Sequence, residues 1–305
     1  MVHLIEAATF GELAAKTKAA CSSSPILNVV LSVQAALPAS NDFFLQTYRV
    51  DAEKWQAPEV PADLVFNHGN YMHRHGDSLN YLITELKNKP SGNRACISLV
   101  DAADIMASKD GKLPSFLLLQ AAIGTDGKKL IMTAYYRALE VSVFLPINLA
   151  EMALIADKIG KNHPTLESVD LTLHAFRAHD SPQFRAHTRS ALDIAAVEGE
   201  IVDAVAAENR QLIATWLLDK ARHESVIDTV GLATLTAELT EAGWEDDVVS
   251  ELNVAVGLEA QLAYARTMGT HAHGVKSLQE ELSSQLSNIA RMLRKPTANR
   301  GHNGH

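Results

Sequence analysis

The chain has 305 residues, of which 47% are hydrophobic and 21% charged, and its formal net charge is -9. This composition is ordinary for a globular protein, and the length allows a sizeable core in one large domain or two modest ones. The acidic excess argues against binding to a nucleic-acid polymer, whose phosphates require clustered Lys and Arg. A small anion is not excluded, because two or three local Arg residues can bind one.

The first 76 residues are expected to form a helix at 10–20, strands at 26–37 and 43–50, and a loop at 51–76. The two strand segments are rich in aliphatic and aromatic side chains, with turn residues Pro38 and Asn41 between them. Pro, Gly and His residues dominate the segment 51–76, which is typical of a loop.

Residues 77–178 are expected to form helices at 77–87 and 148–159 and strands at 95–100, 115–123, 130–136 and 169–176. Asp77 is a suitable N-cap for the first of these helices. The apolar runs 115–123 and 130–136, joined by a turn at Thr125-Asp-Gly127, predict a hairpin that is buried on at least one face.

After residue 180 the pattern becomes helical as far as Lys295. One apolar stripe with helical spacing comprises Leu278, Leu282, Leu286, Ile289 and Leu293, and a shorter one comprises Ile194, Val197, Ile201 and Val205. We therefore predict an α+β domain at 1–180, a helical C-terminal module at 181–298 and a disordered tail at 299–305.

The most informative segment is Arg137-Ala-Leu-Glu140-Val-Ser-Val-Phe-Leu-Pro146-Ile-Asn148, which follows an apolar strand and opens an apolar helix. Ser115 lies 22 residues before Arg137, directly after Pro114 and five residues before Gln120. Together these elements resemble the thymidylate synthase signature, in which a nucleophilic Cys occupies the position of Ser115. The resemblance covers roughly residues 26–178.

The resemblance implies a thymidylate synthase-like mixed sheet with flanking helices, followed by an all-α C-terminal half, and a cytoplasmic homodimer that binds a small pyrimidine nucleotide. It places Arg137 and Arg94 on the phosphate, Asn148 and Gln120 on the base, and His174 on the sugar. It also implies that Glu140, at the signature's acidic position, is a nucleotide-binding residue. Arg94 would act across the dimer interface. The chain departs from the family pattern at Asn93, where the first of two Arg residues is expected, and at Phe176, where a Tyr is expected.

Each of these residues also has a purely structural interpretation. Arg137 would pair with Glu140, and Asn148 would cap the helix that follows Pro146. His174 would be a buried core histidine, Gln120 would need a partner within the apolar run, and Arg94 would be a solvated residue at the start of a strand.

Ser115 stands at the catalytic position, but a hydroxyl needs a strong base to become a nucleophile, whereas a thiol is partly ionised at neutral pH. The following residue, Phe116, supplies no base. Cys96 on a neighbouring strand is expected to be a small buried hydrophobe. We therefore expect ordinary thymidylate synthase activity to be absent. The resemblance also implies a reduced folate, but its activating Glu has no counterpart in residues 51–76, so the sequence does not identify a cofactor.

No metal site and no membrane partner are expected. The pairs His73/His75 and His271/His273, with His302 and His305 in the tail, are not completed into a ligand set by Cys or carboxylate residues. The chain has no apolar run of about 18 residues, the minimum for a transmembrane helix. Residues 1–17 do not form a secretory signal. The two cysteines, Cys21 and Cys96, fit a reducing compartment.

Three hypotheses follow. The chain is a thymidylate synthase-like transferase of nucleotide metabolism that adds a methyl or hydroxymethyl group to C5 without the usual Cys. Alternatively, it is a non-catalytic relative that serves as a dimeric scaffold or interaction protein through its helical half. A third interpretation is a new enzyme whose site lies on the appended helices, because fold alone does not determine function.

Overall fold

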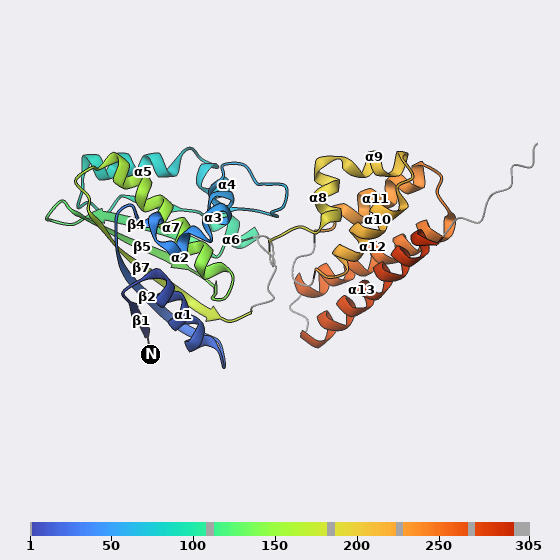
Figure 1. The fold of residues 1–305 in the computed structure, drawn as a ribbon, viewed down its shortest axis with the longest axis horizontal. Helices are drawn as coiled ribbons and strands as arrows, with labels where there is room; N and C mark the ends of the chain where they lie inside the picture. Colours follow the sequence, from blue (N-terminus) through green and yellow to red (C-terminus); the bar gives the residue numbers. More distant parts are fainter. Residues whose placement is uncertain (1, 108–112, 182–186, 224–227, 268–271, 296–305) are drawn as a thin grey trace, which may run out of the picture. The chain divides into compact units, whose positions relative to one another are not determined.

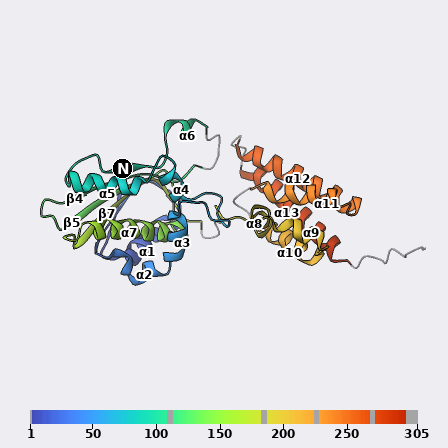
Figure 2. The same ribbon diagram turned by 90° about the horizontal axis from the view of Figure 1, so that it is seen from above.

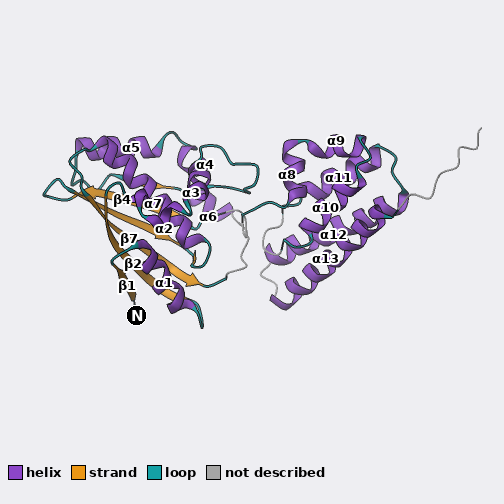
Figure 3. Ribbon diagram, in the orientation of Figure 1, coloured by secondary structure: helices purple, strands orange, loops and turns teal. Residues whose placement is uncertain are grey.

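The computed structural model describes residues 2–107, 113–181, 187–223, 228–267 and 272–295. They belong to two compact units, each considered by itself (Figure 1). The first unit comprises Met1–Pro61, Phe66–Ser108 and Lys112–Phe184, and the second comprises Ala62–Val65, Lys109–Gly111 and Arg185–His305. Within the described ranges, all named strands lie in the first unit, as the secondary-structure colouring shows (Figure 3). The α+β class with a helical C-terminal half is therefore confirmed. No helix among these residues is long and apolar enough to cross a membrane.

A mixed seven-stranded sheet forms the centre of the first unit. Its strands are β1 (His3–Ala7), β2 (Ile26–Ala36), β3 (Cys96–Ser98), β4 (Phe116–Ile123), β5 (Lys129–Tyr136), β6 (Leu139–Glu140) and β7 (Ser168–His179). The order across the sheet is β1-β2-β7-β5-β4-β3, and β6 also pairs with β7. Strand β1 is parallel to β2, and β5 and β6 are parallel to β7, whereas the remaining pairs are antiparallel. The predicted hairpin is the antiparallel pair β4 and β5.

The same unit contains seven α-helices and one 3-10 helix within the described residues. They are α1 (Phe10–Cys21), η1 (Ala39–Asn41), α2 (Phe43–Gln46), α3 (Arg49–Gln56), α4 (His68–His73), α5 (Ser78–Asn88), α6 (Ala102–Ala107) and α7 (Phe144–Asn162). Two predicted starts follow from side-chain caps. Thr9 accepts from the Glu12 amide, while the Glu12 carboxylate accepts from Ala8, and Asp77 accepts from the Asn80 amide as expected.

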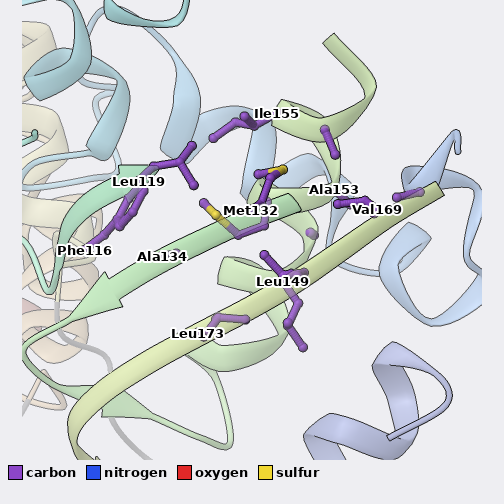
Figure 4. Close-up of a cluster of buried hydrophobic side chains, with 14 of the residues drawn as sticks. Phe116, Leu119, Met132, Ala134, Leu149, Ala153, Ile155, Val169 and Leu173 are labelled. Atoms are coloured by element: carbon purple, nitrogen blue, oxygen red, sulfur yellow. The ribbon is translucent and has the colours of Figure 1, made fainter. Parts of the chain in front are cut away.

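One face of the sheet carries the core. In β5, Leu130, Met132, Ala134 and Tyr136 are buried, and the residues between them are more exposed. Helices α1, α5 and α7 lie over this buried face (Figures 1 and 2). Figure 4 shows Leu149 and Ala153 of α7 in the same buried cluster as Met132 of β5 and Leu173 of β7.

The segment 43–56 is helical, so the strand predicted at 43–50 is wrong. Asp42 caps α2 by accepting from the amides of Phe44 and Leu45. Phe43 is 89% exposed, whereas Leu45, two residues later, is buried. Residues two apart lie on opposite sides of a helix but on the same face of a strand, so this burial pattern fits a helix. The loop predicted at 51–76 is also partly wrong, since α3 and α4 lie within it.

The second unit is a helical bundle made of α8 (Ala191–Glu198), α9 (Glu200–Ala206), α10 (Arg210–Lys220), α11 (Val230–Glu241), α12 (Asp246–Thr267) and α13 (Ala272–Arg294). Four members of the predicted stripe on α13 are buried, namely Leu282, Leu286, Ile289 and Leu293, and this helix packs against α10 and α12. The shorter predicted stripe is divided between α8 and α9 at Gly199, whose φ of +81° ends the first helix. The predicted tail at 299–305 lies outside the described residues.

Candidate functional site

Arg137, the central residue of the signature, binds the loop that precedes β4. Its Nη2 donates to the Leu113 carbonyl at 2.6 Å and its Nε to the Pro114 carbonyl at 3.2 Å. Its backbone amide donates to the carbonyl of Ser115 at 2.9 Å. The guanidinium therefore positions the loop that carries Ser115, and these two donors are not free for an anion in this arrangement.

Glu140 caps helix α7. Its carboxylate, buried within the first unit, accepts four backbone N–H groups: from Ser142 and Ser181 through Oε1 and from Val143 and Phe144 through Oε2. The first amides of a helix have no partners within the helix, and a carboxylate there also interacts favourably with the helix dipole. Glu140 thus explains why α7 begins at Phe144. No ion pair joins Glu140 to Arg137 within the described part of the chain, so the predicted pairing of the two side chains is wrong.

Asn148 lies inside α7, not at its N-cap, which is Val143. The interpretation of Asn148 as the cap is therefore wrong, because Glu140 starts the helix earlier than the sequence pattern predicts. The Asn148 side chain is 4% exposed within this helix. Its ligand role stays a prediction.

Gln120, His174 and Arg94 lie apart from this corner of the unit. Gln120 on β4 donates to the Asn93 carbonyl at 3.1 Å and is paired across the sheet with Thr133. His174 on β7 stacks on Tyr135 of β5, with ring centroids 5.1 Å apart and an interplanar angle of 15°. Both side chains occupy positions that alternate with buried residues, so they face away from the helices. His174 is accordingly not a buried core histidine.

Arg94 is exposed just before β3, where its carbonyl accepts from the Cys96 amide at 2.8 Å. The structure therefore brings Ser115 and Arg137 together through a backbone hydrogen bond, whereas Gln120 and His174 contact Asn93 and Tyr135 instead. Cys96 is partly exposed and in register with Gln120, which differs from the fully buried position expected for it.

A buried pair that the sequence analysis did not find is His68 with Glu151. Nδ1 of His68 lies 3.0 Å from both carboxylate oxygens of Glu151, and the two side chains are 6% and 1% exposed. Gln56 donates to the backbone carbonyl of Glu151 at 2.7 Å, which joins α3 to α7. The sequence signal was the Asn67-His68-Gly69 group, which we took as part of a loop.

Aromatic rings surround this pair. Trp55 lies 4.8 Å from the His68 ring and Phe116 lies 5.4 Å from it, while Tyr136 stacks on Phe116 at 5.2 Å. Burial and, secondly, the charge of Glu151 raise the pKa of Tyr136 well above its usual value. Its buried hydroxyl has no hydrogen-bond partner among the described residues. The cluster is therefore a buried His–Glu pair packed among aromatic rings.

Comparison with known proteins gives little support for any family. No family model matches the chain, and no curated protein matches it. Among the solved structures, the crystal structure of thymidylate synthase from T4 phage is similar at 20% identity with a TM-score of 0.32, covering 37% of this chain and 38% of that one. A likeness of this extent supports no conclusion about function.

Proposed function

We propose that this protein is a non-catalytic, thymidylate synthase-like interaction protein that forms a homodimer through the uncovered face of its sheet. The observation that supports this proposal is the chemistry of that face, which we call the open face. It consists of the outward side chains of β1, β2, β7, β5 and β4, among them Leu4, Val30, His174, Phe176, Tyr135, Ile131 and Leu118.

The open face carries a mainly apolar row, in which Leu118, Tyr135, His174, Val30 and Leu4 are in register, next to a polar row of Gln120, Thr133, Thr172 and Ser32. Phe176 is 63% exposed, Ile131 is 44% exposed and Tyr135 is 36% exposed. Contiguous exposed apolar residues of this kind mark interaction surfaces in soluble proteins. The nearby charges of Lys129 and Asp170 pair with each other at 3.1 Å, which leaves the centre free of unpaired charge.

A second copy is the partner that fits this surface. Five strands spaced about 4.8 Å apart, with about eight residues each, present a face of roughly 24 Å by 26 Å. This area approaches the roughly 800 Å² that each partner buries in a standard interface. Two copies of one twisted sheet stack with similar strand directions, and a two-fold dimer uses the same patch on both subunits.

The same proposal predicts that the protein does not catalyse the thymidylate synthase reaction. Among the described residues, the Ser115 hydroxyl has no base as a hydrogen-bond partner, and Arg137 and Glu140 bind backbone groups. Tritium release from C5-labelled deoxyuridylate with methylene-folate should therefore stay at background. Turnover at roughly 1–10 per second, as is usual for enzymes, would contradict the proposal.

Sedimentation equilibrium of the wild type and one variant tests the dimer. Ile131→Asp places two like charges at the centre of the open face and should weaken the dimer by more than about 100-fold, which is about 3 kcal/mol. Tyr81→Asp on α5 is the matched control, because Tyr81 is 49% exposed on a helix. A monomeric wild type, or equal dissociation of both variants, would exclude the open face as the interface.

A retained pyrimidine nucleotide site is the second candidate function, favoured by the contact between Arg137 and the Ser115 loop. Calorimetric titration with deoxyuridine, deoxycytidine and ribocytidine monophosphates tests it. If one of them binds, Arg137→Lys should weaken binding by about 1.5–3 kcal/mol, because Lys cannot reproduce the guanidinium fork. If none binds, this second candidate is excluded.

A further inference from the structure

The helical unit contains a small cavity that the proposed dimer does not use. It has a volume of about 20 Å³ and is lined by residues of α8, α10, α12 and α13 and of the turn after α10, namely Asp193, Lys220, Ala221, His223, Glu259, Leu262, Gln279, Leu282 and Ser283. A single water needs on the order of 10–15 Å³ on this scale, so the cavity has room for a group of one or two heavy atoms.

Lys220 cannot receive an anion in this cavity. Its ammonium group lies 2.8 and 2.9 Å from the two oxygens of Asp193, 2.9 Å from Oε1 of Glu259 and 2.7 Å from the carbonyl of Asp228. An ammonium group has three protons, so these acceptors already use all of its donors. An anionic ligand would have to break one of these bonds.

Asp193 is also fully occupied. Besides Lys220, its carboxylate accepts from the Ser190 hydroxyl at 2.6 Å and from the Gly231 amide at 3.0 Å. Gly231 is packed so closely that an added Cβ would lie 2.5 Å from the Asp193 carboxylate. Asp193 is therefore a fixed structural counter-ion of Lys220.

Glu259 has spare hydrogen-bonding capacity. It is 2% exposed, and among the described residues Lys220 is its one polar side-chain partner, through Oε1. The three side chains Asp193, Glu259 and Lys220 carry a net charge of -1 when all are ionised. A buried charge without full compensation is costly, and a second cation beside Glu259 would neutralise it.

We propose that this cavity binds a primary ammonium group, with Glu259 as its counter-ion and Gln279 and Ser283 as neutral acceptors at its entrance. Gln279 donates its amide nitrogen to the His223 carbonyl at 3.4 Å, which leaves its amide oxygen to accept from the ligand. Leu262, Leu282 and Ala221 supply an apolar wall for a short aliphatic stem. Three N–H donors and one positive charge thus meet one carboxylate oxygen and two neutral oxygens.

Methylammonium is the probe. Its binding to the full-length protein is measured by ligand-observed NMR at constant ionic strength. We expect saturable binding in the millimolar range, and no saturable binding of tetramethylammonium, which is larger and has no N–H donor. Because burial raises the pKa of Glu259 to about 7, binding at pH 7 should also release protons, measured as a buffer-dependent heat.

Two variants and one control decide the outcome. E259Q removes the counter-ion but keeps the neutral Asp193–Lys220 pair, and S283L fills the entrance with the ion cluster intact. Each should weaken methylammonium binding at least ten-fold, whereas E241Q on the exposed part of α11 should leave it unchanged. Equal binding by E259Q, by S283L or by tetramethylammonium would overturn the proposal, as would no saturable binding by the wild type up to about 100 mM.

Discussion

Glu140 has a larger structural role than any other residue that the signature contains. One carboxylate satisfies four backbone amides from both ends of the segment 142–181. The residue therefore fixes the start of α7 and holds Ser181, just after β7, against it. The resemblance implies that Glu140 binds the nucleotide, yet its contacts are those of a helix cap.

Replacing Glu140 by Ala should lower the free energy of unfolding by roughly 2–4 kcal/mol, because several partly buried amides lose their acceptor together. Chemical denaturation measures this change. Glu167→Ala is the matched control, since the Glu167 carboxylate is 65% exposed and pairs with Lys128 on the surface. Such a pair contributes about 1 kcal/mol or less. Equal effects of the two substitutions would show that the cap is unimportant.

Glu259 makes the stability of the helical unit depend on pH. Burial raises its pKa from 4.5 to about 7, against the opposing effect of Lys220, with Asp193 and Asp228 adding to the rise. Lys220 stays charged, because Asp193 and Glu259 outweigh burial and raise its pKa. His223 also lines the cavity, and its Nδ1 lies 3.8 Å from a carboxylate oxygen of Asp219, while Asp228 pairs with Arg189.

The sign of this effect follows from the direction of the shift. Between pH 4.5 and about 7 the folded protein holds a proton on Glu259 that the unfolded chain releases, so stability falls as the pH rises. At about 1.4 kcal/mol per pKa unit, the loss is on the order of 3 kcal/mol. Denaturation of wild type and E259Q from pH 5 to 8 should show this decline in the wild type relative to the variant. Parallel profiles would contradict it.

Residue roles at the candidate site were only partly predictable. The predicted hairpin of 115–123 and 130–136 is present, and beside it the Arg137 amide donates to the Ser115 carbonyl. The sequence analysis could not show that Arg137 would bind the carbonyls of 113 and 114, since backbone acceptors leave no pattern in the sequence. Nor could it find His68 and Glu151, because a pair separated by 83 residues has no local signature.

At the scale of the elements, Gly69 determines how closely α4 approaches α3. A Cβ at this position would lie 2.1 Å from the carbonyl oxygen of Ala57 and 2.3 Å from that of Gln56. Asn67 completes the contact, because its amide nitrogen lies 2.7–3.1 Å from the carbonyls of Lys54, Ala57 and Glu59. This junction positions His68 next to Glu151.

Gly69→Ala should therefore destabilise the protein by about 2–3 kcal/mol or more, because backbone atoms must move to relieve the overlap. Gly257→Ala is the control, since no atom lies within 4 Å of an added Cβ in the middle of α12. That change should raise the free energy of unfolding by about 0.5–1 kcal/mol and the melting temperature slightly. A neutral Gly69→Ala would show that α3 and α4 are not held this closely.

Elements with a clear period were predictable, and those defined by a cap were not. The long strands β2, β4, β5 and β7 and the helices α1, α5 and α13 agree with the apolar spacing of their sequences. Segment 43–50 was wrong because its aromatic and aliphatic residues match strand propensity, whereas Asp42 starts a helix there. Helix α4 in segment 51–76 was not predicted, because its residues His68–His73 include no regular apolar stripe.

For the whole molecule, the proposed dimer makes thermal stability depend on concentration. Association that occurs only between folded chains raises the melting temperature as protein concentration increases. Differential scanning calorimetry from about 1 to 100 μM should show a rising melting temperature for the wild type and for Tyr81→Asp, but a constant one for Ile131→Asp. A constant melting temperature for the wild type would contradict the proposed dimer.

The two outermost strands of the sheet are its shortest in the main order, with five residues in β1 and three in β3, beside an eleven-residue β2 and an eight-residue β4. A short border offers few unpaired backbone groups for a foreign strand to join. Fibril growth by addition of strands to the edges of this sheet should therefore be slow, even at high protein concentration. The exposed apolar residues Phe176, Ile131 and Tyr135 lie on the open face, which in the proposed dimer stacks in pairs and then stops.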